Sequence, residues 1–162
     1  MGRRKKKPLP PYIPEKFDVI CYSYRWRFEV KPSQILDAGS GVFSLQDIPK
    51  GTVIGFYTGR VRFQHQVSIY PGYLLHVTNN VFIDGGYNPR NVTVMINDAH
   101  RSPYKTNCEF LYFGSEQEFN RDCEGNIDED GDIQVIPLIG IKTTADINEG
   151  DELFLCYGPD YW

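Results

Sequence analysis

DELFLCYGPDYW, residues 151–162, combines an apolar segment, a Gly-Pro turn and a cluster of aromatic side chains. A core strand accounts for Leu153, Phe154 and Leu155, because consecutive apolar residues are typical of a buried strand. It does not account for the rings that follow, Tyr157, Tyr161 and Trp162. Aromatic rings at the end of a strand need other groups to pack against or a ligand to bind. The other segments of the sequence indicate which of these applies.

The composition is that of one folded domain. The chain has 162 residues, and 41% of them are hydrophobic, which is enough for a single domain with its own core. No apolar run approaches the roughly 18 residues that a membrane-spanning helix needs. The charged N-terminal segment lacks the apolar region of a secretory signal. The sequence therefore predicts an intracellular protein without a membrane span.

The cysteines and histidines show no metal-binding pattern. No Cys-x-x-Cys pair occurs, which argues against a zinc cluster and supports disulfides only weakly. The histidines are isolated as well. We expect reduced thiols and no metal site. The residues concerned are Cys21, Cys108, Cys123, Cys156, His65, His76 and His100.

Charge is unevenly distributed along the chain. RRKKK, residues 3–7, precedes several prolines, so residues 1–11 are expected to form a disordered basic tail, with the folded domain at 12–162. The tail is either simply solvated or a patch for nuclear import or nucleic acid. Residues 115–132 carry eight acidic residues and one arginine. This acidic segment either attracts a basic substrate or forms a solvated hairpin.

NIDEDGDIQVI, residues 126–136, has some features of a calcium-binding loop. Asn126 replaces the first acid of an EF-hand loop, Pro137 stands where its bidentate glutamate belongs, and flanking helices are missing. A hairpin turn at Asp130-Gly131 is the better interpretation.

Short strands separated by Gly, Pro, Asn and Asp dominate the rest of the chain, so the fold class is mainly β. Only SEQEFNRD, residues 115–122, has a pattern that allows one or two helical turns. The expected strands are WRFEV (26–30), GVFSL (41–45), TVIGFYTG (52–59), YLLHVT (73–78), VFIDG (81–85), NVTVMI (91–96), CEFLYF (108–113), IQVIPLIGIKTT (133–144) and ELFLCY (152–157).

Four segments resemble, in order, the SET domain of protein lysine methyltransferases. They are AGSGVFSLQDIPKGTVIGFYTG (38–59), YLLHVTNNVFIDGG (73–86), NVTVMINDAHRSPYKTNCEF (91–110) and IKTTADINEGDELFLCYGPDYW (141–162). The resemblance runs from about Trp26 to Trp162 and is to the compact, zinc-free members. It implies several small twisted antiparallel sheets, few short helices, and a C-terminal segment tucked through a loop as a pseudoknot.

The resemblance implies a binding site for S-adenosyl-L-methionine. Gly39, Ser40 and Gly41 would line it with backbone groups, since glycine allows close approach of a ligand, although a lone Gly-x-Gly is as often a plain turn. Asn107 and Cys108 match the Asn-Cys pair that completes the pseudoknot. Further cofactor residues implied by the resemblance are Tyr73, Asn97, Asp98 through its backbone, and Trp162.

The resemblance also implies a lysine channel. Tyr157 would be the catalytic-centre tyrosine, and Tyr57 would line the channel with Phe110 and Leu155. Each tyrosine has a simpler interpretation as a packing residue, and Trp162 could fray. A lysine amine has a pKa of about 10.4, so an aromatic, desolvated channel would help to neutralise it for methyl transfer. Since Leu155 and Phe110 carry no hydroxyl to hold a water, we expect di- or trimethylation to be possible.

One segment departs from the family pattern. Where the family usually has Asn-His-Ser-Cys, this chain has Asn97-Asp98-Ala99-His100, followed by a longer loop. The main hypothesis is a protein lysine methyltransferase in the nucleus that acts on a histone or another basic tail. The alternative is an inactive SET-like module that binds partners in a chromatin complex. Nucleic acid would be contacted at most through the basic N-terminal tail, and the sequence indicates no oligomeric state.

Overall fold

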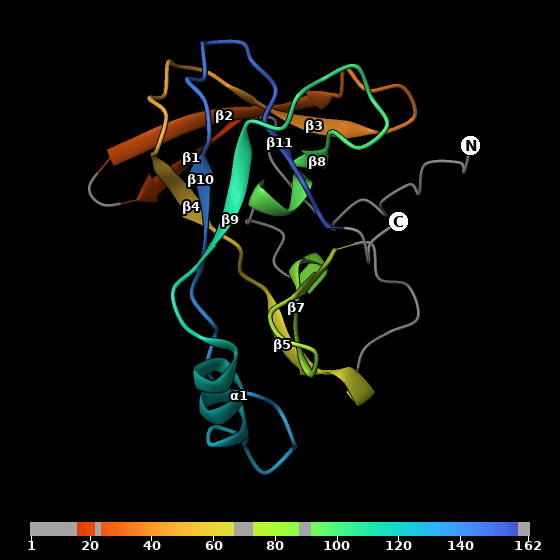
Figure 1. Cartoon of the computed structure of the whole chain (residues 1–162), viewed down its shortest axis with the longest axis vertical. Coiled ribbons are helices and arrows are strands. Elements are labelled where there is room, and N and C mark those ends of the chain that lie inside the picture. The colour runs from red at the N-terminus through yellow and green to blue at the C-terminus, as the bar shows by residue number, and fades with distance from the viewer. Residues whose placement is uncertain (1–15, 22–23, 67–72, 88–91, 159–162) are drawn as a thin grey trace.

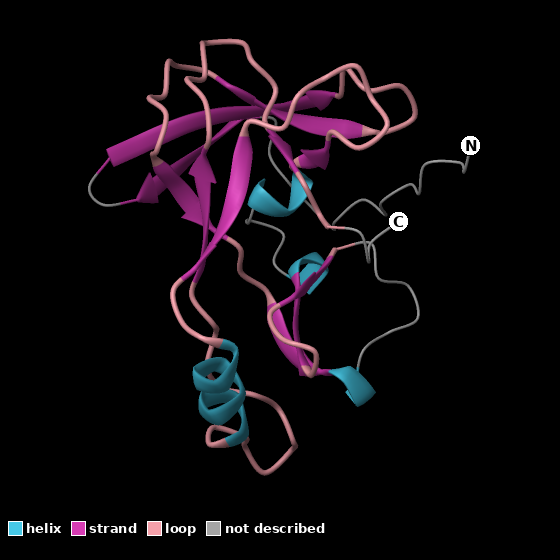
Figure 2. Ribbon diagram, viewed as in Figure 1, coloured by secondary structure: helices cyan, strands magenta, loops and turns pink. Residues whose placement is uncertain are grey.

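The computed structural model describes residues 16–21, 24–66, 73–87 and 92–158. Strands predominate in this part of the chain, which confirms the mainly β class (Figure 2). None of its helices is long and apolar enough to span a membrane. The elements are β1 (Lys16–Cys21), β2 (Tyr24–Pro32), β3 (Ser40–Ser44), β4 (Val53–Phe56), β5 (Arg60–Phe63), η1 (Gln64–Gln66), β6 (Leu74–His76), β7 (Val81–Asp84), η2 (Gly85–Tyr87), η3 (Val92–Met95), β8 (Asn97–Asp98), β9 (Cys108–Tyr112), α1 (Glu116–Glu124), β10 (Ile139–Thr143) and β11 (Phe154–Leu155).

The strands form four small sheets. Three are antiparallel, with strand orders β1-β2-β3, β4-β10-β9 and β5-β7-β6. The fourth pairs β8 with β11 in parallel, which the expectation of antiparallel sheets did not include. Figure 1 shows the first two sheets at one end of the molecule and α1 at the other. Several small sheets are what the resemblance implied.

Two segments expected as strands are not strands. Residues 92–95 form the 3-10 helix η3, with all four side chains buried. A short, fully buried apolar run cannot be assigned to strand or helix from its periodicity, and here the helix is stabilised by the Thr93 hydroxyl, which donates to the Phe56 carbonyl at 3.1 Å. Residues 134–138 also lie outside the strands, because Pro137 has no N–H to contribute to a sheet.

The predicted short helix is confirmed as α1, which continues to Glu124. Ser115 caps it, since its side chain accepts from the Glu118 N–H at 3.1 Å. Phe119 and Cys123 are its buried residues, so α1 uses one face to pack on the domain. The charged face remains in solvent.

The second half of the acidic segment folds back as the predicted hairpin, whereas its first half forms α1. Gly131 has φ of +82°, and the Asp128 N–H donates to the Asp132 carbonyl at 2.9 Å. The Asp128 carboxyl accepts from the backbone N–H groups of Asp130 and Asp132, at 3.0 and 2.8 Å. Its carboxyl therefore closes the turn, as in other Asx turns. Asp132 also pairs with Arg60 at 3.0 Å, which joins the hairpin to β5.

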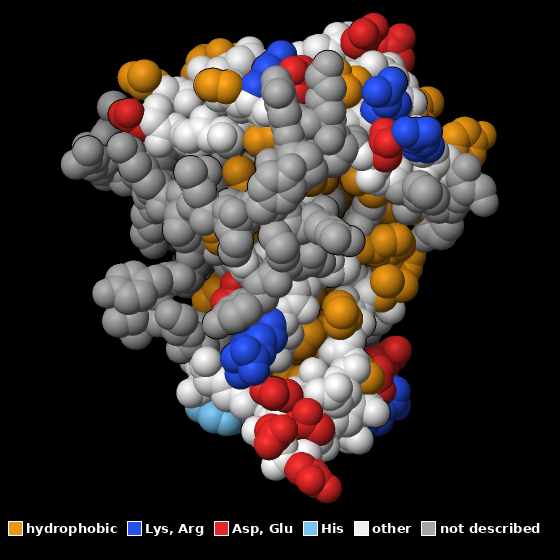
Figure 3. Space-filling view, turned by 180° about the vertical axis from the view of Figure 1, so that it is seen from behind, with side chains coloured by type: hydrophobic (Ala, Val, Ile, Leu, Met, Phe, Trp, Pro, Cys, Tyr) orange, Lys and Arg blue, Asp and Glu red, His pale blue; other side chains and the backbone are white. Residues whose placement is uncertain are grey.

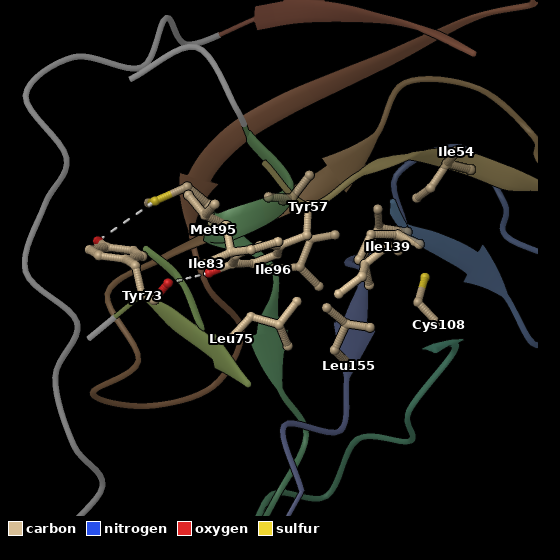
Figure 4. Packing of buried hydrophobic residues seen from close by; sticks show 14 of the residues in the cluster. Ile54, Tyr57, Tyr73, Leu75, Ile83, Met95, Ile96, Cys108, Ile139 and Leu155 are labelled. Carbon is tan, nitrogen blue, oxygen red and sulfur yellow. Dashed lines mark hydrogen bonds between the residues drawn. The ribbon is translucent and has the colours of Figure 1, made fainter. Parts of the chain in front are cut away.

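The core is one large cluster of apolar side chains from most of the strands. Ile139 and Ile141 on β10 are fully buried, and Leu155 on β11 is 1% exposed. Figure 4 shows Leu155 among Ile96, Ile139 and Cys108, beneath the ring of Tyr57. A smaller cluster joins Ala99 to Phe154 on the other side of β11.

The C-terminal segment lies between two other parts of the chain. On one side Phe154 and Leu155 pair with Asn97 and Asp98. On the other side the Asn107 N–H donates to the Phe154 carbonyl at 3.0 Å, and the Asn107 side chain bonds both the Phe154 N–H, at 2.7 Å, and the Glu152 carbonyl, at 2.9 Å. The loop 99–107 joins the two sides, so the segment is bonded to both ends of this loop, as expected for the pseudoknot of the resemblance.

Asn107→Ala should lower the free energy of unfolding by about 2–3 kcal/mol, because two side-chain hydrogen bonds that clamp the C-terminal segment are lost at about 1–1.5 kcal/mol each. Urea unfolding measures the change. Asn79→Ala is the matched control, since Asn79 is exposed and surface changes of this kind cost within about 0.5 kcal/mol. Equal stability of the two variants would contradict the clamp.

Candidate active site

Glycine is favoured at positions 39 and 41 of the Gly39-Ser40-Gly41 turn for different physical reasons. Gly39 has φ of +73°, in the region that favours glycine, and a Cβ there would meet nothing within 4 Å. At Gly41 a Cβ would lie 2.1 Å from Oε1 of Glu152. The backbone therefore leaves open space at Gly39, whereas Gly41 makes room for a buried carboxyl group. The sequence had suggested only the close approach of a ligand.

Asn97 lies directly against this turn. Its side chain is buried, with 1% of the residue exposed, and Nδ2 donates to the Ser40 carbonyl at 2.9 Å. Among the described residues, none donates a hydrogen bond to Asn97 Oδ1. Every fully buried side-chain nitrogen or oxygen in the described part of the chain has a hydrogen-bond partner, so this oxygen is not fully enclosed. Asn97 thus offers an acceptor to a ligand beside the turn.

Asp98 contributes its side chain, where the resemblance assigned only its backbone. One carboxyl oxygen accepts from the His100 N–H at 2.7 Å, and the other accepts from the Tyr157 N–H at 2.9 Å. Ala99 is buried against Phe154 in the smaller cluster. The segment that departs from the family pattern therefore still holds Tyr157 in place, because the Asp98 carboxyl group bonds both His100 in the loop and Tyr157.

Tyr157 is held at both ends by neighbouring residues of one segment. Its backbone N–H binds Asp98, and its hydroxyl donates to the carbonyl of Ile96. The ring is half-buried and packs against the core. Two anchors on residues 96 and 98 fix the orientation of the ring without covering it completely.

Tyr57, Tyr73 and Phe110 form an aromatic group next to the core. Tyr57 is buried, and its hydroxyl donates to the Tyr73 carbonyl at 2.5 Å. Phe110 on β9 contacts the Tyr57 ring edge-on, with centroids 6.1 Å apart. The Tyr73 hydroxyl lies 3.9 Å from the sulfur of Met95, as the dashed line in Figure 4 marks. The structure thus brings together two residues expected in the channel and one expected beside the cofactor.

Sequence reasoning missed two residues that shape the site. Glu152 is 2% exposed and contacts both the glycine turn and Asn97. Gly85 donates its N–H to the Tyr73 carbonyl at 3.0 Å, and a Cβ there would lie 2.9 Å from the Tyr57 hydroxyl. The Gly85-Gly86 pair after a strand could have been noted as a point of close approach. No local signal marked Glu152 as buried.

Other expected residues are buried in the core or lie outside the described residues. Leu155 is completely inside the core, below Tyr57. Burial raises the pKa of Cys108 to about 12, so this thiol stays protonated at neutral pH and serves as a core residue. Trp162 and Tyr161 belong to residues 159–162, which the structure does not describe.

The residues around β8 fit a ligand that carries a positively charged amine. An unused oxygen on Asn97 and the open space at Gly39 form one side of the site. Asp98, the residue after Asn97, holds Tyr157 through its backbone N–H. A metal ion has no comparable set of ligands, because no group of three or more His, Cys, Asp or Glu side chains gathers in the described part of the chain.

Comparison with protein-family models identifies a matching family. The family model of the SET domain matches residues 39–158, which include the glycine turn, β8 and Tyr157. No curated protein matches the chain in a sequence comparison.

Proposed function

Because this chain belongs to the SET-domain family, whose members are generally protein lysine methyltransferases, we propose that it is an S-adenosyl-L-methionine-dependent protein lysine N-methyltransferase. The observation that carries the proposal is the arrangement on β8. Asn97 directs its side-chain nitrogen to the glycine turn and leaves its oxygen as an unused acceptor, and the next residue, Asp98, holds Tyr157. The expected cofactor site and the expected reaction centre are therefore built on adjacent residues.

The cofactor supplies a methyl group bound to a positively charged sulfur. Asn97 Oδ1 and backbone groups of Gly39 and Ser40 would bind its amino-acid end, since oxygen acceptors suit an ammonium group. The carbonyls of Gly39 and Ser40 already accept from the Ser33 N–H and from Asn97 Nδ2, and each has a second lone pair. The Asp98 side chain is occupied by the backbone N–H groups of His100 and Tyr157. It therefore keeps the shape of the site when no ligand is bound.

The tyrosines would orient the lysine amine. The hydroxyl protons of Tyr57 and Tyr157 are donated to the carbonyls of Tyr73 and Ile96, and a tyrosine hydroxyl that donates its proton can also accept from an amine N–H. Removing a proton from lysine at neutral pH costs about 4 kcal/mol, from about three pKa units. A desolvated aromatic channel lowers that cost, and alignment of the amine with the methyl group supplies the rest of the catalysis.

A basic protein tail, such as that of a histone, is the substrate we propose, with the nucleus as the compartment. The charge of the acidic segment supports this choice. Glu124, Glu129 and Asp130 are exposed and belong to none of the salt bridges among the described residues. Figure 3 shows acidic side chains gathered at the end of the molecule formed by α1 and the hairpin. The negative electrostatic potential of these side chains raises the association rate of a cationic peptide, and this effect weakens as the salt concentration rises.

Calorimetry with S-adenosylhomocysteine, followed by transfer of a tritiated methyl group to purified histones, tests the proposal. We expect saturable binding of S-adenosylhomocysteine and labelling of lysine. Binding without transfer to any basic protein would refute the histone substrate. The absence of binding would refute the enzyme and favour an inactive interaction module in a chromatin complex.

Phe110→Tyr should shift the product toward monomethyl-lysine. Phe110 is half-buried beside Tyr57, so an added hydroxyl at the ring can hold a water that blocks rotation of a methylated amine. The wild type, without that hydroxyl, is expected to reach di- or trimethyl-lysine. Mass spectrometry of a peptide at long reaction times measures the product ratio, and an unchanged ratio would contradict the prediction. The corresponding change at Leu155 is less suitable, because a tyrosine there would overpack the core.

A further inference from the structure

Glu152 is a buried acid whose contacts stability alone does not explain. Its Oε1 accepts from the Ser33 hydroxyl at 2.6 Å, and its Oε2 accepts from the Gln34 N–H at 2.9 Å. Ser33 Oγ accepts in turn from the Ile35 N–H at 3.0 Å, so its proton points to the carboxyl group. Glu152 takes part in none of the salt bridges among the described residues. Burying an acid without a cation is costly, which suggests a role in the site.

The third contact of Glu152 is with Asn97. The amino group of Asn97 lies 2.9 Å from the Ser40 carbonyl and 3.5 Å from Glu152 Oε1. Both neighbours are acceptors, so the nitrogen must face them and the amide oxygen must face away. The Glu152 contact is the longer one, yet an oxygen in that place would meet two other oxygens.

We propose that Glu152 is a positioning residue, which sets the rotation of the Asn97 amide so that Oδ1 is presented to the ammonium group of the cofactor. This inference rests on the proposed function. Glu152 itself need not touch the ligand, since Asn97 stands between them. The position of the Glu152 carboxyl group also explains why residue 41 is a glycine, because this group occupies the space that a Cβ would need.

Glu152→Gln reverses the pattern of donors. The Gln34 N–H is a fixed donor, so the glutamine oxygen has to stay there, and the glutamine nitrogen has to replace Oε1. Ser33 can rotate its hydroxyl to accept. Asn97 can accept only if its amide turns over, which breaks the bond to Ser40 and points a donor at the ligand's ammonium group. The geometry of the fold changes little, whereas the acceptor is lost.

Calorimetry with S-adenosylhomocysteine tests the effect on binding. Glu152→Gln should weaken the affinity about 10- to 100-fold, as expected for one hydrogen bond to a charged group. Ser33→Ala, which removes the other partner of Oε1 and leaves Glu152 an acceptor, should stay within about 3-fold of wild type. Equal losses in the two variants would mean a merely structural role and overturn the proposal.

A double-variant cycle separates positioning from general damage. In an Asn97→Ala background, Glu152→Gln should cause no further loss of affinity, because there is no amide left to turn. Additive losses would overturn the proposal.

A measurement on the free protein keeps this test apart from the proposed function. Exchange of the Asn97 side-chain amide protons, followed by NMR, should be at least about 10-fold faster in Glu152→Gln than in wild type, because the turned amide loses its bond to Ser40. Unchanged exchange would overturn the role of Glu152 whether or not the cofactor binds. Absence of binding in wild type would instead remove the proposed function.

Discussion

Tyr157→Phe is expected to lower the rate of methyl transfer at least ~100-fold, the loss typical of removing one group that acts in the transition state. The hydroxyl is the only part removed. Asp98 still holds the backbone N–H of residue 157, and the ring still packs against the core, so the phenylalanine should occupy the same place. The free energy of unfolding should fall by about 1 kcal/mol, because the bond to the Ile96 carbonyl is lost.

Single-turnover transfer of a tritiated methyl group to a peptide measures the rate, and calorimetry measures the affinity for S-adenosylhomocysteine, which should be unchanged. Tyr24→Phe is the matched control, since Tyr24 lies on β2 and is 66% exposed. It should leave both quantities as in wild type. A Tyr157→Phe variant with the rate of the Tyr24→Phe control would remove Tyr157 from the reaction.

Gly41→Ala is expected to destabilise the protein by about 3 kcal/mol and to abolish binding of S-adenosylhomocysteine. The added methyl group would lie 2.1 Å from Glu152 Oε1 and 2.8 Å from Cδ. The end of a free side chain could move away, but this carboxyl group is held by Ser33 and Gln34. The variant therefore either overpacks the site or breaks buried hydrogen bonds, each at about 1–3 kcal/mol. Displacement of Glu152 would also release Asn97.

Gly51→Ala is the control for the backbone. Gly51 has φ of +84° and open space around a Cβ, so alanine there costs only about 1–2 kcal/mol of conformational strain. Gly51 lies in a turn before β4. The Gly51→Ala variant should therefore bind S-adenosylhomocysteine with the affinity of wild type. If Gly41→Ala were no more destabilising than Gly51→Ala, or bound the ligand normally, the close contact with Glu152 would be of no consequence.

The residues of the candidate site that the sequence indicated come from short ordered patterns. The glycine turn, Asn97 and Tyr157 could be located because each stands in a segment with a recognisable spacing, and those segments are adjacent in the fold. Strand positions with clear turn residues on both sides, such as Val81–Asp84, were also predicted correctly.

What the sequence could not predict depends on tertiary contacts. Residues 92–95 have no alternation that separates a strand from a buried 3-10 helix. Glu152 follows an acidic residue in a loop-like stretch and resembles a solvated charge, yet its donors Ser33 and Gln34 are distant in sequence. β5, with Arg60 and Arg62 on alternate positions, is a strand because it pairs with β7, and the acidic partner of both arginines, Asp132, lies on the distant hairpin.

The position of the C-terminal segment also determines when the site can exist during synthesis. Residues 154 and 155 complete the parallel pair with β8, and residue 157 receives its anchors from residues 96 and 98. A nascent chain that has emerged only as far as β10 can form antiparallel sheets, but its loop 99–107 has nothing to enclose. Contacts so distant in sequence form slowly, since the loop has to wait for a segment that is synthesised about 50 residues later. Ribosome-bound chains should therefore acquire affinity for S-adenosylhomocysteine in a single late step, after residue 157 has left the exit tunnel.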